Sequence, residues 1–541
     1  MDSCFALRAP PRLCVFGYLG YAAVIRLIIS VFLEGFMGLV GRGLMLLLVA
    51  LVMVGCDGGS VGADSSSVAD SQAGLDRPAG IDWFEGSVEG AFAEAAAQDK
   101  PLFLYWGAVW CPPCHELKGT IFKQQAFIDQ SKWFIPVYLD GDTEQAQLYG
   151  ETFSVYGYPT VIVFSPQGTE ITRIPGGMDI QRYMGILELA INAITPVADL
   201  VAAVKADQPI SSADWELLAY YSWGQDRGKV LAENSTTQER YDLFQLLAAN
   251  CPEDLTLVKS RLQLLAIEQW VGLESEDLAL RDNYLNQLKT ILADAKLRSA
   301  NRDSLMYGGA ALSAALAQGP ELASLRQQLV DNLRGILANT ELNLLMRLRA
   351  LSGWVLLQNA SLAEDQDLGT EQLAWIKEQV TWGLAAADQY QYHSAVNSLS
   401  QALLDANLID DARQMLVSSL RVTKHPYYLM SDLGYLEAQL GNNQEALGWY
   451  KQAWDTSKGP ATRIQWGVNY VVNLIELAPQ NIGGIKLASS AVLQELSGQN
   501  NGFYQRTATR IGELDRKLES WADSPEKLGV LEKFREGTSQ L

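Results

Sequence analysis

Apolar and polar positions follow two different patterns along the chain. Between Trp83 and Ile194, short apolar runs of strand length are separated by stretches with helical spacing. From about Ala198 onward the strand pattern disappears, and apolar residues recur every three or four positions over long segments. The pattern predicts an α/β domain over residues 81–195, followed by an all-α region over residues 198–541.

The elements expected in the α/β domain alternate between helix and strand before two final strands and a closing helix. They are a helix over 87–98, a strand over 102–106, a helix over 114–130, a strand over 134–139, a short helix over 145–153, strands over 160–164 and 170–174, and a helix from Asp179.

The all-α region contains a repeat of 34 residues, the period of a paired-helix unit. The matched positions are Ala412 with Ala446, Leu416 with Tyr450, and Pro426 with Pro460. Residues 427–460 resemble a tetratricopeptide repeat through Leu433, Gly434, Gly441, Ala446, Tyr450 and Ala453. The sequence therefore predicts a helical solenoid of tetratricopeptide-like (TPR-like) repeats over 198–541, clearest at 393–460.

Several side chains of the all-α region invite a functional interpretation, but packing explains them better. Cys251 precedes Pro252 at a predicted helix boundary, and we expect a buried, inert thiol there. We expect packing between helices for the tryptophans Trp354, Trp375, Trp382, Trp449 and Trp454.

The N-terminal part of the chain has the pattern of a secretory signal. Residues 44–54 are all apolar, Arg42 precedes them, and Gly55 and Cys56 follow. The run is short for crossing about 30 Å of hydrocarbon. The segment resembles the bacterial lipobox, which implies that Cys56 becomes the first mature residue and carries lipid.

These features predict a lipoprotein signal peptide over 37–55, then lipidated Cys56 and a flexible linker over 56–80. A single-pass helical anchor is the alternative. Residues 1–36 are either an over-extended start or an extra membrane segment. The expected location is the extracytoplasmic face of a bacterial cell envelope; Asp57 resembles a signal that retains lipoproteins in the inner membrane.

Charge and residue counts exclude several functions. With 41 basic and 62 acidic residues the net charge is -21, which argues against nucleic-acid partners. Six dispersed cysteines suit neither a disulfide scaffold nor a four-thiolate zinc site. His115, His393 and His425 lie in three distant segments, so we expect no metal centre and no Ser/His/Asp triad.

One close cysteine pair, Cys111-Pro112-Pro113-Cys114, lies where a predicted strand leads into a helix. A helix N-terminus stabilises a thiolate through its unpaired N–H groups and partial positive charge. We therefore expect Cys111 to be the more accessible, nucleophilic thiol and Cys114 to be the resolving thiol, the two forming a redox-active disulfide. Pro112 and Pro113 suit the first helical turn.

Around this pair, residues 81–195 resemble the thioredoxin superfamily, especially periplasmic thioredoxin-like proteins and the C-terminal domain of membrane thiol-disulfide interchange proteins. The motifs that carry the resemblance are Lys100-Pro101, Trp110 before the Cys-x-x-Cys pair, and Gly157-Tyr158-Pro159-Thr160. The resemblance implies a cis bond before Pro159 and a substrate-binding role for Trp110, Tyr158 and Pro159.

Two departures from the family pattern concern proton handling. Tyr105 stands where cytoplasmic thioredoxins keep a buried acid, and no lysine occurs on the strand over 134–139. His115 and Glu116 are near enough in sequence to substitute, although exposure on the helix surface is the favoured interpretation for both.

Two other interpretations of the cysteine pair are weaker. A structural disulfide would have the same spacing but needs neither the strand-to-helix position nor Gly157-Tyr158-Pro159. Residues 111–115 also match the Cys-x-x-Cys-His string of haem attachment, which requires a second axial ligand and a helical pocket. The sequence predicts no metal and no cofactor.

The favoured functional hypothesis is a membrane-tethered, extracytoplasmic thiol-disulfide oxidoreductase. It would exchange disulfides with protein substrates, be recharged by a redox partner, and bind a protein partner through its helical region. The family resemblance implies a reductase-like direction. The alternative is a scaffold lipoprotein whose helical region organises a complex and whose cysteine pair is structural or vestigial.

Overall fold

The computed structural model describes residues 77–540, with gaps at 156, 194, 364–365 and 500–504. The described residues belong to one compact unit. The predictions for residues 1–36, the signal peptide over 37–55, lipidation of Cys56 and most of the linker lie outside the described residues.

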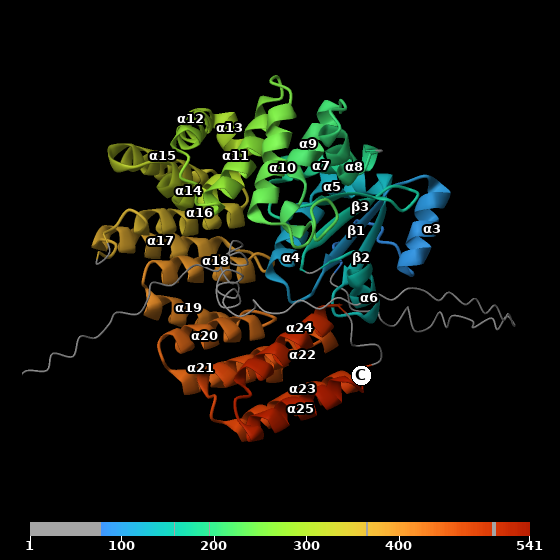
Figure 1. The fold of residues 1–541 in the computed structure, drawn as a ribbon, viewed down its shortest axis with the longest axis vertical. Coiled ribbons are helices and arrows are strands. Elements are labelled where there is room, and N and C mark those ends of the chain that lie inside the picture. Colours follow the sequence, from blue (N-terminus) through green and yellow to red (C-terminus); the bar gives the residue numbers. More distant parts are fainter. Residues whose placement is uncertain (1–76, 156, 194, 364–365, 500–504, 541) are drawn as a thin grey trace, which may run out of the picture. The chain divides into compact units, whose positions relative to one another are not determined.

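A four-stranded sheet forms the centre of the α/β domain (Figure 1). Its strands are β1 (Leu102–Gly107), β2 (Ile135–Asp140), β3 (Thr160–Phe164) and β4 (Glu170–Ile174), in the spatial order β2-β1-β3-β4. β1 runs parallel to β2 and antiparallel to β3, which pairs antiparallel with β4. β1, β2 and β3 are buried at every position, because helices cover both faces.

The helices of this domain begin where the sequence places capping residues. Ser87, Thr143 and Asp179 cap α3 (Val88–Gln98), α6 (Glu144–Thr152) and α7 (Ile180–Asn192) through their side-chain oxygens. The α/β fold class and nearly all its element positions are therefore confirmed.

The single helix expected over 114–130 was wrong. The segment divides into α4 (Pro112–Leu117), a wider π-type turn η1 (Lys118–Phe122), α5 (Gln125–Gln130) and the short turn η2 (Ser131–Trp133). The chain leaves helical geometry at Gln124, where φ is -74° and ψ is 135°. The break lets Phe122 and Phe127 face one aromatic core, with ring centroids 4.8 Å apart.

Beyond residue 196 the described chain is helical, which confirms the all-α region. Its first part consists of α8 (Val197–Lys205), α9 (Ser212–Tyr220), η3 (Trp223–Gln225), α10 (Thr237–Asn250), α11 (Thr256–Gly272), α12 (Leu278–Ala293), α13 (Ala295–Ala300), α14 (Arg302–Leu316), α15 (Gly319–Ala338), α16 (Leu344–Asn359) and α17 (Thr370–Ala386).

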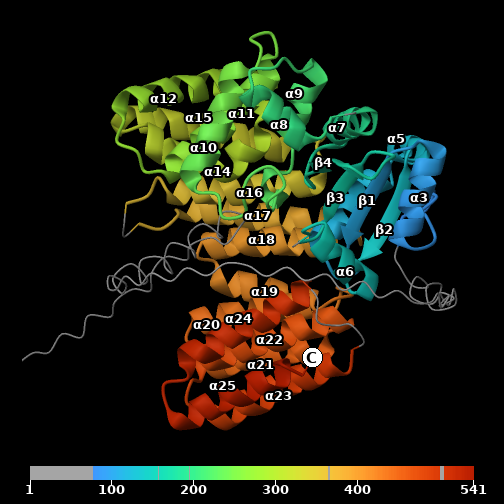
Figure 2. The same ribbon diagram turned by 45° about the vertical axis from the view of Figure 1, so that its right-hand side comes forward.

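The second part consists of α18 (Tyr392–Asp405), α19 (Ile409–Ser419), α20 (Tyr427–Gln439), α21 (Asn443–Thr456), α22 (Pro460–Leu477), α23 (Ile482–Ser497), α24 (Gln505–Trp521) and α25 (Pro525–Thr538). Consecutive helices pack on one another, among them α10 on α11, α15 on α16 and α20 on α21 (Figure 2). Among the described residues, no single helix is both long and apolar enough to cross a membrane, although α7 and α8 meet those criteria as a pair across an 81° bend.

The α/β domain and the all-α region, which we call the two halves of the chain, share an apolar core. One continuous cluster of buried side chains begins at Ile81, includes Tyr183 and Leu187 of α7, and continues through α8 and α9 to Ala266 of α11. The boundary that we placed at residues 195–198 therefore falls within a shared core, and the division into two separate domains stays a prediction.

The 34-residue period is visible in the helices. α19 begins at Ile409 and α21 at Asn443, and Ala412 and Ala446 are both buried. A Cβ on Gly434 would lie 2.9 Å from the Tyr450 ring, so this glycine allows α20 and α21 to approach closely. The tetratricopeptide assignment itself stays a prediction.

The packing roles assigned from the sequence hold for Trp354, Trp375, Trp454 and Cys251, whereas Trp449 is only partly buried and also borders a surface depression. Trp354 and Trp454 are buried, and the ring centroids of Trp354 and Trp375 are 4.5 Å apart. Cys251 is a buried free thiol, and burial raises its pKa to about 11. A thiol with this pKa is a poor nucleophile at neutral pH.

Replacing Gly434 by alanine should destabilise the fold by about 1–3 kcal/mol, because the new methyl group would force the Tyr450 ring out of the α20–α21 contact. Gly448 in α21 has no atom within 4 Å of a built Cβ. Gly448→Ala is therefore the matched control and should raise stability by about 0.5–1 kcal/mol through helix propensity. Urea unfolding of both variants checks the pair, and equal effects would contradict the packing argument.

Candidate functional site

The cysteine pair follows the C-terminal end of β1. Cys111 is the N-cap residue of α4, and Pro112 and Pro113 occupy the first turn. Cys111 and Cys114 form a disulfide with Cα atoms 5.2 Å apart. The backbone N–H of Cys114 donates to Cys111 Sγ at 3.2 Å. The same donor is placed to stabilise a Cys111 thiolate in the reduced protein.

The Gly157-Tyr158-Pro159 motif lies at the same end of the sheet. The Tyr158–Pro159 bond is cis, as the family resemblance implies. Pro159 directly precedes β3, whose Thr160 is in register with Trp106 of β1. Because β1 and β3 are antiparallel, the last residue of β1 and the first residue of β3 lie at the same end of the sheet. Pro159 therefore lies at the end of the sheet where the cysteine pair lies.

Both cysteines are buried in this arrangement, contrary to the expected exposure of Cys111. Cys111 is 2% exposed and Cys114 is fully buried. The helical half covers them: the ring of Tyr428 stacks on Trp110 at 5.4 Å between centroids, and the Arg506 guanidinium lies 4.6 Å from the Trp110 ring. Trp110 and the cysteines thus belong to an apolar cluster made mostly of α20–α25 side chains.

Asp142 joins the two halves beside this cluster. It accepts from Trp110 Nε1 at 2.6 Å, and from the backbone N–H and hydroxyl of Thr462 at 3.0 and 2.7 Å. Thr462 lies in the first turn of α22, so Asp142 satisfies a helix-end N–H that has no intrahelical partner. Burial raises the pKa of Asp142, although these hydrogen bonds and nearby Arg506 oppose that rise.

α4 makes two further contacts with the helical half. The Ser394 hydroxyl of α18 donates to the Pro112 carbonyl at 2.7 Å. Glu116, 5% exposed, forms a two-pronged ion pair with Arg349 of α16, in which Arg349 Nη1 donates to Glu116 Oε1 at 3.0 Å. The surface interpretation of Glu116 was therefore wrong: the helical half, which sequence spacing could not place, covers it.

The three histidines gather around α4, although the sequence separates them widely. The rings of His115 and His425 stack with centroids 6.0 Å apart. His393 is buried beside Tyr428, and both His115 and His425 lie near enough to affect its pKa. His115 itself donates through Nε2 to the Val109 carbonyl at 2.6 Å, so it is not a solvated surface side chain.

A buried acid lies at the end of β2, where sequence reasoning expected none. Asp140 is in register with Gly107 of β1, and burial together with Asp142 raises its pKa to about 6, while Lys118 opposes the rise. Lys118 is buried, with Nζ 3.4 Å from the Tyr138 hydroxyl. The signal that could have found Asp140 and Asp142 is an Asp-Gly-Asp sequence directly after a buried strand.

No cluster of three or more His, Cys, Asp or Glu side chains suited to a metal ion occurs among the described residues. The histidine rings pack against one another and against tyrosines rather than converging on a shared centre.

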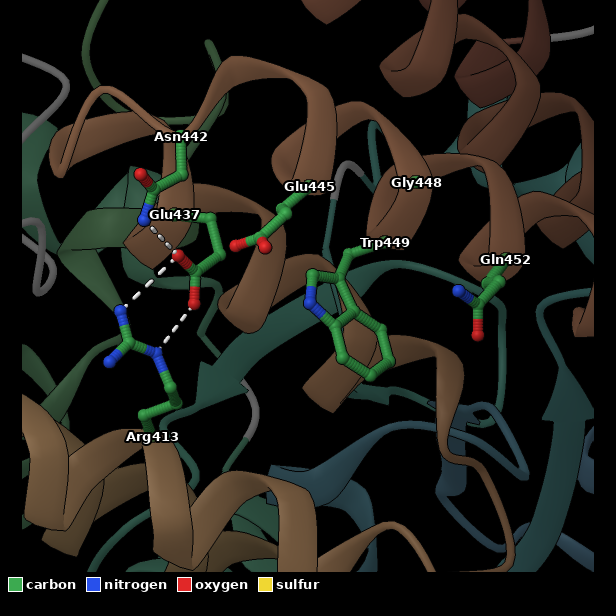
Figure 3. Close-up of a pocket in the computed structure, with 7 residues that line it drawn as sticks. All are labelled: Arg413, Glu437, Asn442, Glu445, Gly448, Trp449 and Gln452. Atoms are coloured by element: carbon green, nitrogen blue, oxygen red, sulfur yellow. Dashed lines mark hydrogen bonds and ion pairs between the residues drawn. The ribbon is translucent and has the colours of Figure 1, made fainter.

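A separate polar depression of about 650 Å³ lies on α19–α21 (Figure 3). Arg413 forms an ion pair with Glu437, which also accepts from Asn442. The indole ring of Trp449 and the carboxylate of Glu445 border the same hollow. The depression lies on the predicted repeat rather than at the cysteine pair.

A four-stranded α/β fold with a Cys-x-x-Cys pair at a helix start and a cis-proline at the same edge defines a thioredoxin-like domain. The family model described as thioredoxin-like domain matches residues 88–191, so this part of the chain belongs to that class.

Over 99 residues the chain is 33% identical to proteins named thiol:disulfide interchange protein DsbD from Yersinia pestis, among them those of strain Pestoides F and of biovar Antiqua strains Antiqua and Nepal516. The match covers 17% of this chain and 16% of each relative, so the chain spans about a sixth of their length. A solved structure named DsbH oxidoreductase is 16% identical over 22% of this chain and 92% of its own, with a TM-score of 0.20.

Proposed function

We propose that this protein is a thiol-disulfide oxidoreductase that acts on protein substrates through Cys111 and Cys114. The observation that carries the proposal is the cysteine pair at the start of α4, in a domain similar to thiol:disulfide interchange proteins. The Cys111 thiolate would attack a client disulfide and release one client thiolate, which takes up a proton. Cys114 would then attack the mixed disulfide, which frees the second client thiol and leaves the Cys111–Cys114 disulfide.

Trp110, Tyr158 and Pro159 would form the surface that receives the client. The rings of Trp110 and Tyr158 are in edge-to-face contact at 5.8 Å, beside the cysteine pair. An extended client segment could pair with the backbone of Tyr158, which lies two residues before the start of β3. A second redox protein would reduce the disulfide again after each cycle.

We further propose that the protein works as a reductase, because the family resemblance of residues 81–195 implies that direction. The names of its relatives indicate exchange but give no direction. The reduction potential of the Cys111–Cys114 couple, measured against glutathione, tests this. We expect a value near or below about -200 mV, whereas a value near -120 mV would indicate an oxidase.

Attachment to the membrane through lipid on Cys56 is part of the proposal. The apolar run over 44–54 ends at Gly55, so this segment would direct export and lipid on Cys56 would tether the exported chain to the membrane. Mass analysis of the mature chain should find acylated Cys56 as the first residue. A mature chain that keeps residues 44–54 would replace the lipid with a helical anchor.

The helical half would supply a contact for a protein partner. The depression beside Trp449 and Glu445 combines an aromatic face with a carboxylate, which suits a basic side chain. A photo-crosslinker at position 449 should capture that partner in cells, while one at exposed Leu278 should not. Equal capture at both positions would reject the assignment.

A scaffold lipoprotein is the second candidate, favoured by the burial of both sulfurs. In that case the disulfide would be structural, and a chain with Cys111→Ser and Cys114→Ser would keep its cellular role. Loss of that role in a stably folded double variant would reject the scaffold function.

A further inference from the structure

The helical half closes the region where a client would approach the cysteine pair. We call the four side chains that close it, Ser394, Tyr428, Thr462 and Arg506, the helical cover. They contact Pro112, Trp110 and Asp142 of the α/β domain. Thiol-disulfide exchange requires a thiolate to reach a sulfur atom, and both cysteines are buried beneath this cover. Exchange with a protein client therefore requires the cover to move.

The contact between the helical cover and the cysteine region combines polar and apolar groups. Its polar anchor is Asp142, with three hydrogen bonds across or beside the boundary, and its apolar part includes the Trp110–Tyr428 ring contact. A Cβ on Gly459 would lie 2.7 Å from Asp142 Oδ2, and the φ of Gly459 is +93°. The approach of α22 to Asp142 therefore depends on a glycine at this position.

The histidine cluster, His115, His393 and His425, lies within the same contact and joins three elements. His115 belongs to α4, His393 to α18, and His425 to the segment between α19 and α20. His393 Nδ1 lies 3.3 Å from the Thr423 hydroxyl, and His425 Nδ1 lies 3.1 Å from the Tyr427 hydroxyl.

The charges that face the cluster are mostly positive or already paired. His115 and His425 face His393, and His115 also faces His425 together with three lysines, of which Lys424 is its sequence neighbour. The charged and titratable groups around the cluster are Lys118 of η1, Lys424 and Lys458 of the helical half, Tyr427 and Tyr428 of α20, the Glu116–Arg349 pair, Arg506 of α24, Asp140 at the end of β2 and Asp142 just after it. Protonated histidines here would repel one another and the lysines.

We propose that the helical cover over the cysteine pair is releasable, and that protonation of the histidine cluster releases it, so that acidification opens the site to clients. The purpose of the opening rests on the proposed thiol-disulfide exchange. The opening itself can be measured without any client.

The sign of the pH effect follows from linkage. Burial, reinforced by neighbouring positive charges, lowers the pKa of His393 to about 3 and that of His425 to about 4. In an open state both would return to about 6.5, so the open state binds more protons below pH 6.5 and the closed state loses stability as pH falls. At pH 5 each histidine would favour opening by about 30-fold relative to pH 7.5.

The two carboxylates act in the opposite direction. Burial raises the pKa of Asp142 and raises that of Asp140 to about 6, so acidification favours the state that buries them. The two histidines together would favour opening by about 900-fold, and Asp140 would oppose it about tenfold. Asp142 opposes it further, and we expect a net opening on the order of tenfold at pH 5. Without His393 and His425 the pH response should vanish or change sign.

The experiment measures how fast a phosphine reductant reduces the Cys111–Cys114 disulfide in the full-length chain, purified in mild detergent. Each rate is divided by the rate for the same chain unfolded in urea at the same pH, and the inverse of this ratio is the protection of the disulfide. The wild type is compared at pH 7.5, 6 and 5 with the double variant His393→Asn, His425→Asn. The single variants replace the double variant if its circular dichroism shows that it does not fold.

We expect wild-type protection to fall about tenfold from pH 7.5 to pH 5, and that of the histidine variant to stay constant or rise. Gly459→Ala should lose protection at pH 7.5, whereas Gly441→Ala should not: Gly441 also has positive φ, +78°, but no atom lies within 4 Å of its Cβ. Constant wild-type protection, or the same fall in the histidine variant, would overturn the inference. Failure of opened Gly459→Ala to reduce any protein disulfide would instead overturn the proposed function and leave the opening intact.

Discussion

Replacing Cys111 by serine is expected to abolish disulfide exchange, with a loss of at least about a thousandfold, because the attacking thiolate is removed. Cys111 is the N-cap residue of α4, and its sulfur accepts from the Cys114 N–H at 3.2 Å. Cys114→Ser leaves this nucleophile in place but removes the resolving thiol. The Cys114→Ser variant should therefore accumulate mixed disulfides with clients, which nonreducing gels detect.

The control for this comparison is a background in which the helical cover is opened. Both variants are therefore also made with Gly459→Ala, so that a failure to trap clients cannot be caused by burial of the cysteines. Trapping by Cys114→Ser and not by Cys111→Ser is the expected result. Equal trapping by both variants, or an alkylation pKa of Cys111 at or above about 8.5, would contradict the assigned order of attack.

Replacing Arg349 by methionine is expected to lower the free energy of unfolding by about 2–4 kcal/mol. The substitution leaves the buried carboxylate of Glu116 without its guanidinium partner, and an uncompensated buried charge is costly. The double variant Glu116→Gln, Arg349→Met removes both charges and should recover most of the loss. Urea unfolding of the two single variants and the double variant measures the coupling.

An exposed ion pair of the same region provides the comparison. Lys377 and Asp411 lie 2.8 Å apart with both side chains more than a third exposed. Lys377→Met should therefore change stability by less than about 1 kcal/mol. If Arg349→Met and Lys377→Met had equal effects, the α4–α16 ion pair would contribute no more to stability than a surface pair, which would contradict the prediction.

The strands over 160–164 and 170–174 have the predicted bounds because each is a run of apolar or alternating residues whose signal is contained in five positions. The helix caps at Ser87 and Asp179 are local in the same way, since each side chain bonds an N–H three residues ahead. The break at Gln124 is different, because it serves the contact between Phe122 and Phe127 inside an aromatic core. Sequence spacing contains no signal for it.

The sequence by itself determined the chemistry available to this protein: a close cysteine pair at a strand-to-helix junction, the Tyr158-Pro159 motif, and an all-α second half. These are features of short segments, and short segments carry their own hydrogen-bonding and periodicity signals. Only the tertiary structure decided that the cysteine pair is covered and that Glu116 pairs with Arg349. It also decided that His115 and His393, 278 residues apart in sequence, lie close together. Such contacts depend on how the surfaces of the α/β domain and the helical half fit together, and nothing in the spacing along the chain encodes that fit.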